Sequence, residues 1–203
     1  MTWFLSALWA GGEEIGLQNV PLDTAINTLA RQTGHNFVLS PNSVSGLDAE
    51  GNSISRPAIT FQGETTAADL LAKLLKDNGL VMVDDPVTTV ARIAFTNEPT
   101  RKADAALLAG DTNAPIQVLN FVDVPLDVAL EEIAGRSGAL KVVVDSQLAA
   151  PPVTADNQLV VPPQVSVRWE KITARQALLA LAVNYDLAIT PDKQTGGWRV
   201  KKR

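Results

Sequence analysis

Four segments of the chain carry apolar residues every three or four positions, the spacing that predicts amphipathic helices. Their apolar stripes are Leu22, Ala25, Ile26, Leu29 and Ala30; Ala67, Leu70, Leu71, Leu74 and Leu75; Leu126, Ala129, Leu130, Ile133 and Ala134; and Ala174, Ala177, Leu178, Leu181 and Ala182. The residues at the ends agree with helices. Thr66 with Asp69, and Thr173 with Gln176, have the spacing of a capping box. Residues that tolerate left-handed backbone stand just beyond the segments: Gly34, Gly79, Gly138 and Asp186.

Short segments of alternating or β-branched residues lie between these helices and predict strands. In the first half they cover residues 17–20, 37–39, 59–62, 80–83 and 89–95, and in the second half 116–122, 142–144, 165–169, 187–189 and 198–201. Phe61 and Trp169 fall on the apolar face of their strands, and Trp198 shares a face with Val200, so we expect them in the core. Each half thus has the order β-α-β-β-α-β-β. This order predicts an α+β fold with a small sheet and two helices on one face of it.

The two halves also match residue by residue, which indicates an internal duplication. Val20-Pro21-Leu22-Asp23 reappears as Val124-Pro125-Leu126-Asp127. The later blocks that begin at Thr66 and Thr173 keep the same order. We therefore predict two tandem domains, at residues 13–96 and 116–203. Residues 97–115 form the linker, with a short helix within 102–108. Long loops, at 41–57 and 149–163, occupy the same place in both halves.

The duplicated pattern resembles the short domain found at the N-terminus of secretins and of TonB-dependent transducers. The resemblance rests on V-P-L-D-x-A-[IL]-x-x-[LI]-A-x-x-[ST]-G followed by strands and T-A-x-x-[LA]-L-x-x-L. It covers residues 16–95 and 116–202, which is nearly the whole chain after the N-terminal segment. It implies a periplasmic protein–protein interaction or assembly module in bacterial secretion or the cell envelope. Its implied partner is a secretin, a TonB-system protein or an assembly component, with self-association also open. Both long loops depart from the family pattern, which puts any specific known contact in doubt.

Composition and charge argue against several other classes of function. The net charge is −5, the pI is about 4.9, and the one basic cluster is Lys201-Lys202-Arg203, which we interpret as a solvated tail. We therefore expect no nucleic-acid partner. Residues 3–10 are apolar and precede Gly11-Gly12, so residues 1–12 resemble the end of a signal peptide or a flexible arm. Because no apolar run reaches about 18 residues, we expect no membrane span.

The sequence offers little for catalysis, and we predict no catalytic, cofactor-binding or metal-binding residue. Cysteine is absent and His35 is the only histidine. Asp84-Asp85-Pro86 is typical of a turn, as is Gly196-Gly197 between strands. Asp48, Glu50 and Asn52 alternate like a calcium loop but lack the required glycine and glutamate spacing. Two alternatives remain open: a small-ligand or glycan receptor, with exposed Trp169 or Trp198 beside the long loops, and an enzyme. We expect partners to add to strand edges through main-chain hydrogen bonds, a mechanism that names no interface residue.

Overall fold

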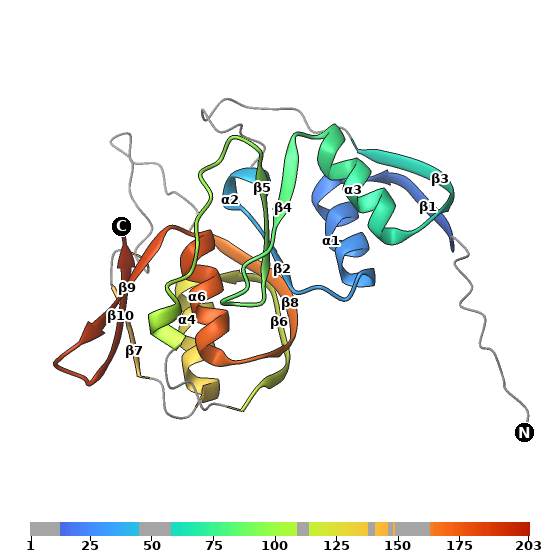
Figure 1. The fold of residues 1–203 in the computed structure, drawn as a ribbon. Helices are drawn as coiled ribbons and strands as arrows, with labels where there is room; N and C mark the ends of the chain where they lie inside the picture. The colour runs from blue at the N-terminus through green and yellow to red at the C-terminus, as the bar shows by residue number, and fades with distance from the viewer. Residues whose placement is uncertain (1–12, 45–57, 109–113, 138–140, 146–147, 149–162) are drawn as a thin grey trace, which may run out of the picture. The chain divides into compact units, whose positions relative to one another are not determined.

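The computed structural model describes residues 13–44, 58–108, 114–137, 141–145, 148 and 163–203 (Figure 1). The predicted signal segment, most of both long loops, Gly138 and the Asp48–Asn52 pattern lie outside these residues. The elements are β1 (Glu13–Val20), α1 (Leu22–Gln32), β2 (Phe37–Leu39), α2 (Pro41–Val44), β3 (Ile59–Thr65), α3 (Ala67–Asp77), β4 (Leu80–Val83), β5 (Ala91–Phe95), the 3-10 helix η1 (Ala105–Leu108), β6 (Ile116–Pro125), α4 (Leu126–Ser137), β7 (Val142–Val144), β8 (Gln164–Ile172), α6 (Ala174–Asn184), β9 (Leu187–Asp192) and β10 (Gly197–Lys202). The α+β class is confirmed, and η1 lies in the predicted short helix.

The strands pair in the same way in both halves, but the expectation of one small sheet per half is wrong. β1 pairs with β3, and β6 with β8, as two-stranded antiparallel sheets. The other strands form two three-stranded sheets, β2-β5-β4 and β7-β10-β9, each with one parallel and one antiparallel pair. In the second half, α4 contacts β6 and also β7. Helix α4 therefore contacts strands of two different sheets. The spacing of apolar residues along the chain does not show how the strands divide between sheets.

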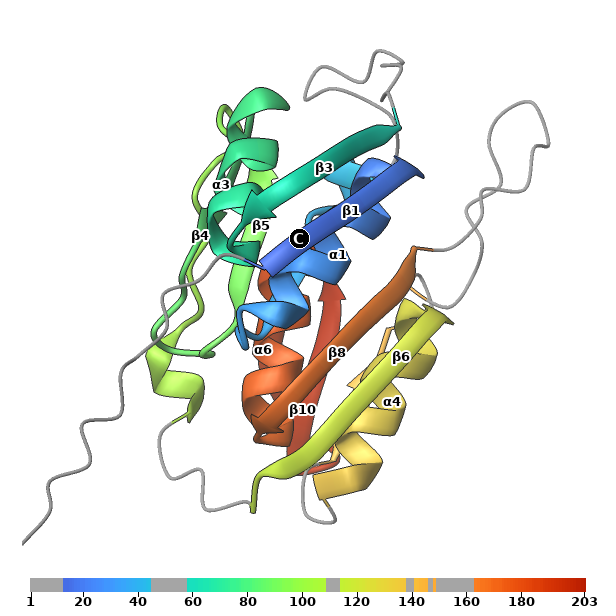
Figure 2. The same ribbon diagram turned by 90° about the vertical axis from the view of Figure 1, so that its right-hand side faces the viewer.

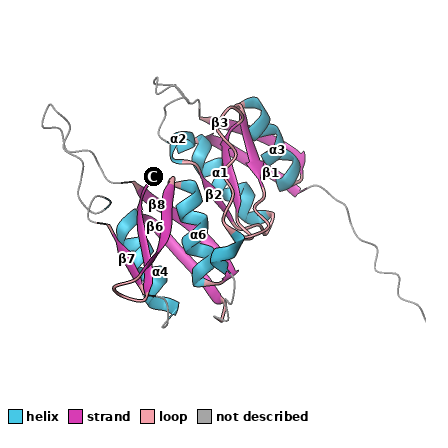
Figure 3. Ribbon diagram, turned by 60° about the vertical axis from the view of Figure 1, so that its left-hand side comes forward, coloured by secondary structure: helices cyan, strands magenta, loops and turns pink. Residues whose placement is uncertain are grey.

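The described elements group into two compact units that differ from the predicted tandem domains. The smaller unit holds β1, α1, β3 and α3, and the larger unit holds all other elements. Residues 35–54 and 79–96 thus group with the second half. Figure 3 distinguishes the helices and strands of both units by colour. Independent folding of residues 13–96 and 116–203 stays a prediction.

In the smaller unit, the two helices contact each other, and β1 pairs with β3. The predicted stripe of α1 is buried throughout, and α3 buries its four leucines. Thr66 Oγ1 accepts a hydrogen bond from the Asp69 N–H, as the capping signal predicts. Gly34 follows α1 with a φ of +74°, a left-handed conformation that glycine adopts without strain.

The larger unit has a core that joins β2 and β5 to the second half. Trp169 has no exposed surface, and its Nε1–H donates to the Phe37 carbonyl at 2.8 Å. Helix α6 is buried on more than its predicted stripe, because Leu179 and Ala180 are also covered. The helix contacts β2 as well as β9. A helix that is apolar all round is buried on several sides, and α6 follows this rule. The capping box of Thr173 and Gln176 is complete.

A bulge recurs at the same place in both two-stranded sheets. Asn19 in β1 and Asp123 in β6 have φ values of +52° and +51°, and the register shifts beside each of them. The Asn19 N–H donates to Thr60 Oγ1 at 3.1 Å, and the Asp123 N–H donates to Ser166 Oγ at 2.9 Å. Bulges are specific features rather than defects. The match extends the duplication to backbone geometry and to the hydroxyl on the opposite strand.

Candidate functional site

A buried polar network lies in the larger unit. Arg92 on β5 forms an ion pair with Glu98, and their side chains are only 11% and 5% exposed. Ser40 Oγ lies 3.0 Å from both carboxylate oxygens of Glu98. Arg92 Nε donates to Asn184 Oδ1 on α6 at 3.2 Å, and Asn184 Nδ2 donates to the Leu39 carbonyl at 2.9 Å. Because each member is bonded to another, the network holds β2, β5 and α6 together. Glu98, within the predicted linker, is therefore bonded to the larger unit.

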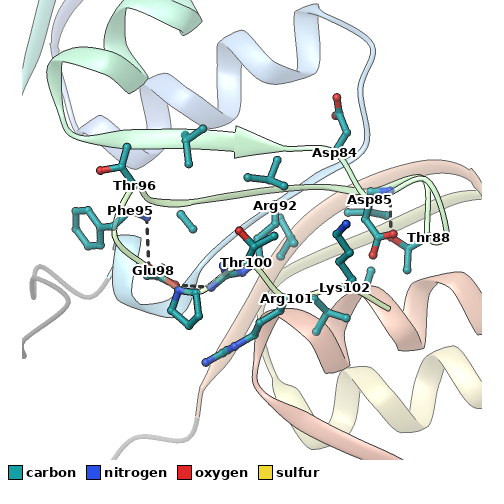
Figure 4. A pocket seen from close by; sticks show the side chains of 18 residues that line it. Asp84, Asp85, Thr88, Arg92, Phe95, Thr96, Glu98, Thr100, Arg101 and Lys102 are labelled. Carbon is teal, nitrogen blue, oxygen red and sulfur yellow. Dashed lines mark hydrogen bonds and ion pairs between the residues drawn. The ribbon is translucent and has the colours of Figure 1, made fainter. Parts of the chain in front are cut away.

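Beside this network is a small cavity, shown in Figure 4. Its volume is about 70 Å³, whereas small-molecule sites usually enclose roughly 300–1,000 Å³. Its polar groups are largely engaged within the chain. Asp85 Oδ1 accepts from the Val87 N–H at 2.9 Å, and Asp85 Oδ2 accepts from the Ala103 N–H at 3.2 Å. The predicted Asp84-Asp85-Pro86 turn is thus confirmed, and these carboxylates are not arranged as an acid–base pair.

A second cavity, of about 140 Å³, lies beneath η1 in the larger unit. Its lining combines apolar residues of η1, α6 and β9 with the charged residues Lys102, Asp104 and Arg203. Within the described ranges, no group of three or more histidine, aspartate or glutamate side chains is placed to hold a metal ion.

The other residues singled out in the sequence have structural positions. His35 is exposed. Trp169 is fully buried, and Trp198 is half-buried with the Arg175 guanidinium 5.2 Å from its ring centre. Gly196 has a φ of +69° in the turn between β9 and β10, as predicted. Lys201 and Lys202 pair with β9, so they belong to a strand rather than to a tail, while their side chains are exposed to solvent as expected.

The sheet of β6 and β8 presents a different kind of site: an open strand edge (Figure 2). In the ranges that the structure covers, β6 pairs with β8 alone. Leu119 and Phe121 of β6 point into the core, while Val118 and Val122 are 42% and 66% exposed. Helix α4 runs beside the strand in Figure 2 and contacts it. We name residues 116–122 the β6 edge.

Hydrogen bonds on β8 show which backbone groups of the β6 edge face outward. Asn36 bonds both main-chain groups of Glu170: its Oδ1 accepts from the N–H at 2.8 Å, and its Nδ2 donates to the carbonyl at 2.9 Å. Glu170 therefore directs these groups away from β6. Val118 stands opposite Glu170, and Asn120 stands opposite Arg168. Because antiparallel pairs alternate, the N–H and C=O groups of Val118 and Asn120 also face away from β8. Arg136 Nη1 lies 3.5 Å from the Val118 carbonyl.

The sequence of the β6 edge itself carries little of the usual protection of a free strand edge. Residues 116–122 read I-Q-V-L-N-F-V and contain no charge, proline or glycine. Natural edge strands are commonly shielded by charges, prolines, bulges or short length. Here the bulge comes only at the end of the strand. The exposed valines, and a backbone that no second described strand pairs with, therefore form a surface suited to another strand.

The first half provides an internal comparison for this surface. The alignment that places Val20 on Val124 places Glu14 on Val118 and Gln18 on Val122. Glu14 and Gln18 are also exposed in the structure, on β1. The same strand position therefore accepts polar residues without loss of the fold. Sequence reasoning missed this site, although a comparison of exposed positions between the halves would have found it.

No family model, curated protein or solved structure matches this chain. In the described part of the chain, none of the helices has the length and apolar character needed to cross a membrane.

Proposed function

We propose that this protein is a non-catalytic protein-interaction or assembly module of the bacterial cell envelope. The observation that carries the proposal is the β6 edge, where two exposed valines flank unpaired main-chain groups. A strand that adds to such an edge gains main-chain hydrogen bonds, and its side chains pack against alternate residues. The periplasmic location rests on the resemblance to the secretin and TonB short domain and on the apolar segment at residues 3–10.

The comparison between the halves supports function at this surface rather than a packing requirement. A fold that tolerates Glu14 and Gln18 on β1 does not need valines at 118 and 122 on β6. Exposed apolar residues on an uncharged edge promote unwanted pairing. A surface that binds a partner explains why apolar residues are kept on this edge despite the risk of unwanted pairing. We therefore propose the β6 edge as the interface.

The receptor alternative draws less support from the described residues. It expects aromatic side chains that are free to stack on a ligand. Trp169 has no exposed surface, and its indole N–H is already bonded to Phe37. Trp198 carries Arg175 over its ring. The buried network of Arg92 and Glu98 likewise stabilises the unit and leaves little room for a bound molecule.

The test is site-specific photo-crosslinking in the cell envelope. A benzophenone amino acid replaces Val122 on the β6 edge, and the matched control replaces Gln18 on β1. We expect Val122 to give adducts with an identified secretin, TonB-system or envelope assembly protein, or with a second copy of this chain. We expect Val118→Glu to abolish these adducts. Equal labelling at the two positions, or hydrolytic turnover by the purified chain, would overturn the proposal.

A further inference from the structure

We propose that the partner of the β6 edge is a second copy of this chain. The two β6 strands pair antiparallel about a twofold axis at Asn120. This inference rests on the proposed function and specifies its partner. It follows from the order of residues along the edge, from the charges at the two ends of the edge and from the outward-facing backbone of Val118 and Asn120.

The β6 edge is symmetric about Asn120 in its apolar pattern. Val118 and Val122 lie two residues on either side, and both are exposed, while Leu119 and Phe121 between them are buried. An antiparallel pair centred on Asn120 places Val118 of one copy opposite Val122 of the other. Asn120 stands opposite its own equivalent. The contact therefore forms two identical valine pairs, which is the self-complementarity that a twofold interface requires.

The backbone at the centre of the edge is available for this pairing. The N–H and C=O groups of Val118 and Asn120 face away from β8, as the Asn36–Glu170 hydrogen bonds establish. The Arg136 contact with the Val118 carbonyl is 3.5 Å long, which is weak for a hydrogen bond. A second strand replaces this contact with shorter main-chain bonds. Such a strand extends the two-stranded sheet to four strands, and sheets of three or more strands are more stable than isolated pairs.

Charge also favours a second copy in the antiparallel sense. The strand is neutral from Ile116 to Val122, so it meets its equivalent without repulsion. Acidic side chains stand at one end, with Asp123 on β6 and Asp127 on α4. The other end carries Arg136, which pairs with Glu132, and Lys171 on β8; Glu170, which stands opposite Val118 at this end, pairs with Arg168. Antiparallel pairing brings the acidic end of each copy beside the end with Arg136 of the other, whereas parallel pairing brings like ends together.

The chain offers a clean test because it contains no cysteine. In the proposed dimer, Asn120 and its equivalent form a directly opposed, hydrogen-bonded pair with Cα atoms about 5.5 Å apart, a distance that a disulfide spans. Asn120→Cys is therefore expected to convert to a disulfide-linked dimer under mild oxidation. The matched control is Gly16→Cys on β1. Gly16 aligns with Asn120, is exposed, and a Cβ added there meets nothing within 4 Å.

Sedimentation equilibrium of the intact chain gives the second measurement. We expect a reversible dimer. Val118→Glu places a carboxylate near Asp123 of the second copy, and it should weaken association about tenfold or more. The variant should fold, because Glu14 occupies the aligned place in β1. The control is Val128→Thr on the exposed side of α4. Threonine stands at the aligned position 24 of α1, so this variant should leave association unchanged.

The outcomes separate the two proposals. A monomeric chain, together with equal disulfide formation by Asn120→Cys and Gly16→Cys, overturns the self-pairing. If the photo-crosslinker at Val122 still labels another envelope protein in that case, the interaction function stands and only the identity of the partner is wrong. A dimer that forms equally well with Val118→Glu also overturns the proposed geometry, because the contact then lies elsewhere on the molecule.

Discussion

Removal of the buried carboxylate of Glu98 should destabilise the larger unit strongly. In Glu98→Ala, the Arg92 guanidinium loses its counter-charge while its side chain stays only 11% exposed. The Ser40 hydroxyl loses two contacts of 3.0 Å, and the Phe95 N–H loses one of 3.4 Å. Breaking a buried pair by removing one partner costs about 3–5 kcal/mol, because the other charge remains without compensation. Arg92 keeps its bond to Asn184, so we expect about 3 kcal/mol, the lower end of that range.

Urea unfolding followed by tryptophan fluorescence measures this cost, because Trp169 and Trp198 both belong to the larger unit. The control is Glu170→Ala, which breaks the Arg168–Glu170 pair in the same unit. That pair is 40% and 56% exposed, so it should contribute less than about 1 kcal/mol. The double variant Arg92→Leu with Glu98→Leu should cost less than Glu98→Ala, because no buried charge is left alone. Equal effects of Glu98→Ala and Glu170→Ala would refute the reasoning.

Two further predictions concern the same unit. Trp169→Phe should lower the free energy of unfolding by about 2–3 kcal/mol, because it leaves the buried Phe37 carbonyl without its 2.8 Å donor and removes buried ring surface. For Trp198→Phe, whose ring is half-buried, urea unfolding should show a loss of about 1 kcal/mol or less. A larger loss for Trp198→Phe than for Trp169→Phe would contradict this prediction. Burial raises the pKa of Tyr185, the only tyrosine, from 10.0 to about 12. Since the folded pKa is the higher one, this group's contribution to stability is complete below about pH 10 and is lost as the pH rises through about 12. Absorbance titration of the phenolate checks this, and ionisation of the folded chain near pH 10 would contradict it.

The sequence by itself predicted the four long helices, the strands and their order, but it missed α2, which lies where the long loop at 41–57 was expected. The duplication stays a prediction that rests on the matching residues of the two halves. Apolar stripes on α1 and α4 are read directly from spacing, and local residues set the helix ends. Thr173 with Gln176 and left-handed Gly34 behave as local chemistry predicts. These features depend on residues within a few positions of each other, so one chain segment carries the whole signal. The signal for the bulges was present too, as a small polar residue before V-P-L-D with a hydroxyl residue on the opposite strand. The left-handed backbone of Asn19 and Asp123 that forms the bulges is seen only in the structure.

The tertiary structure alone decided which surfaces are covered and which stay open. Contacts between residues far apart in the chain bury Ala180 on α6. Such contacts also place β2 and β5 with the second half. The same holds for the pairing of Arg92 with Asn184 and for the side-chain bonds of Asn36 along β8. Periodicity shows which face of a strand is buried but not which edge is paired, because main-chain hydrogen bonds are the same for every residue type. The open β6 edge therefore appears only when the strands are assembled.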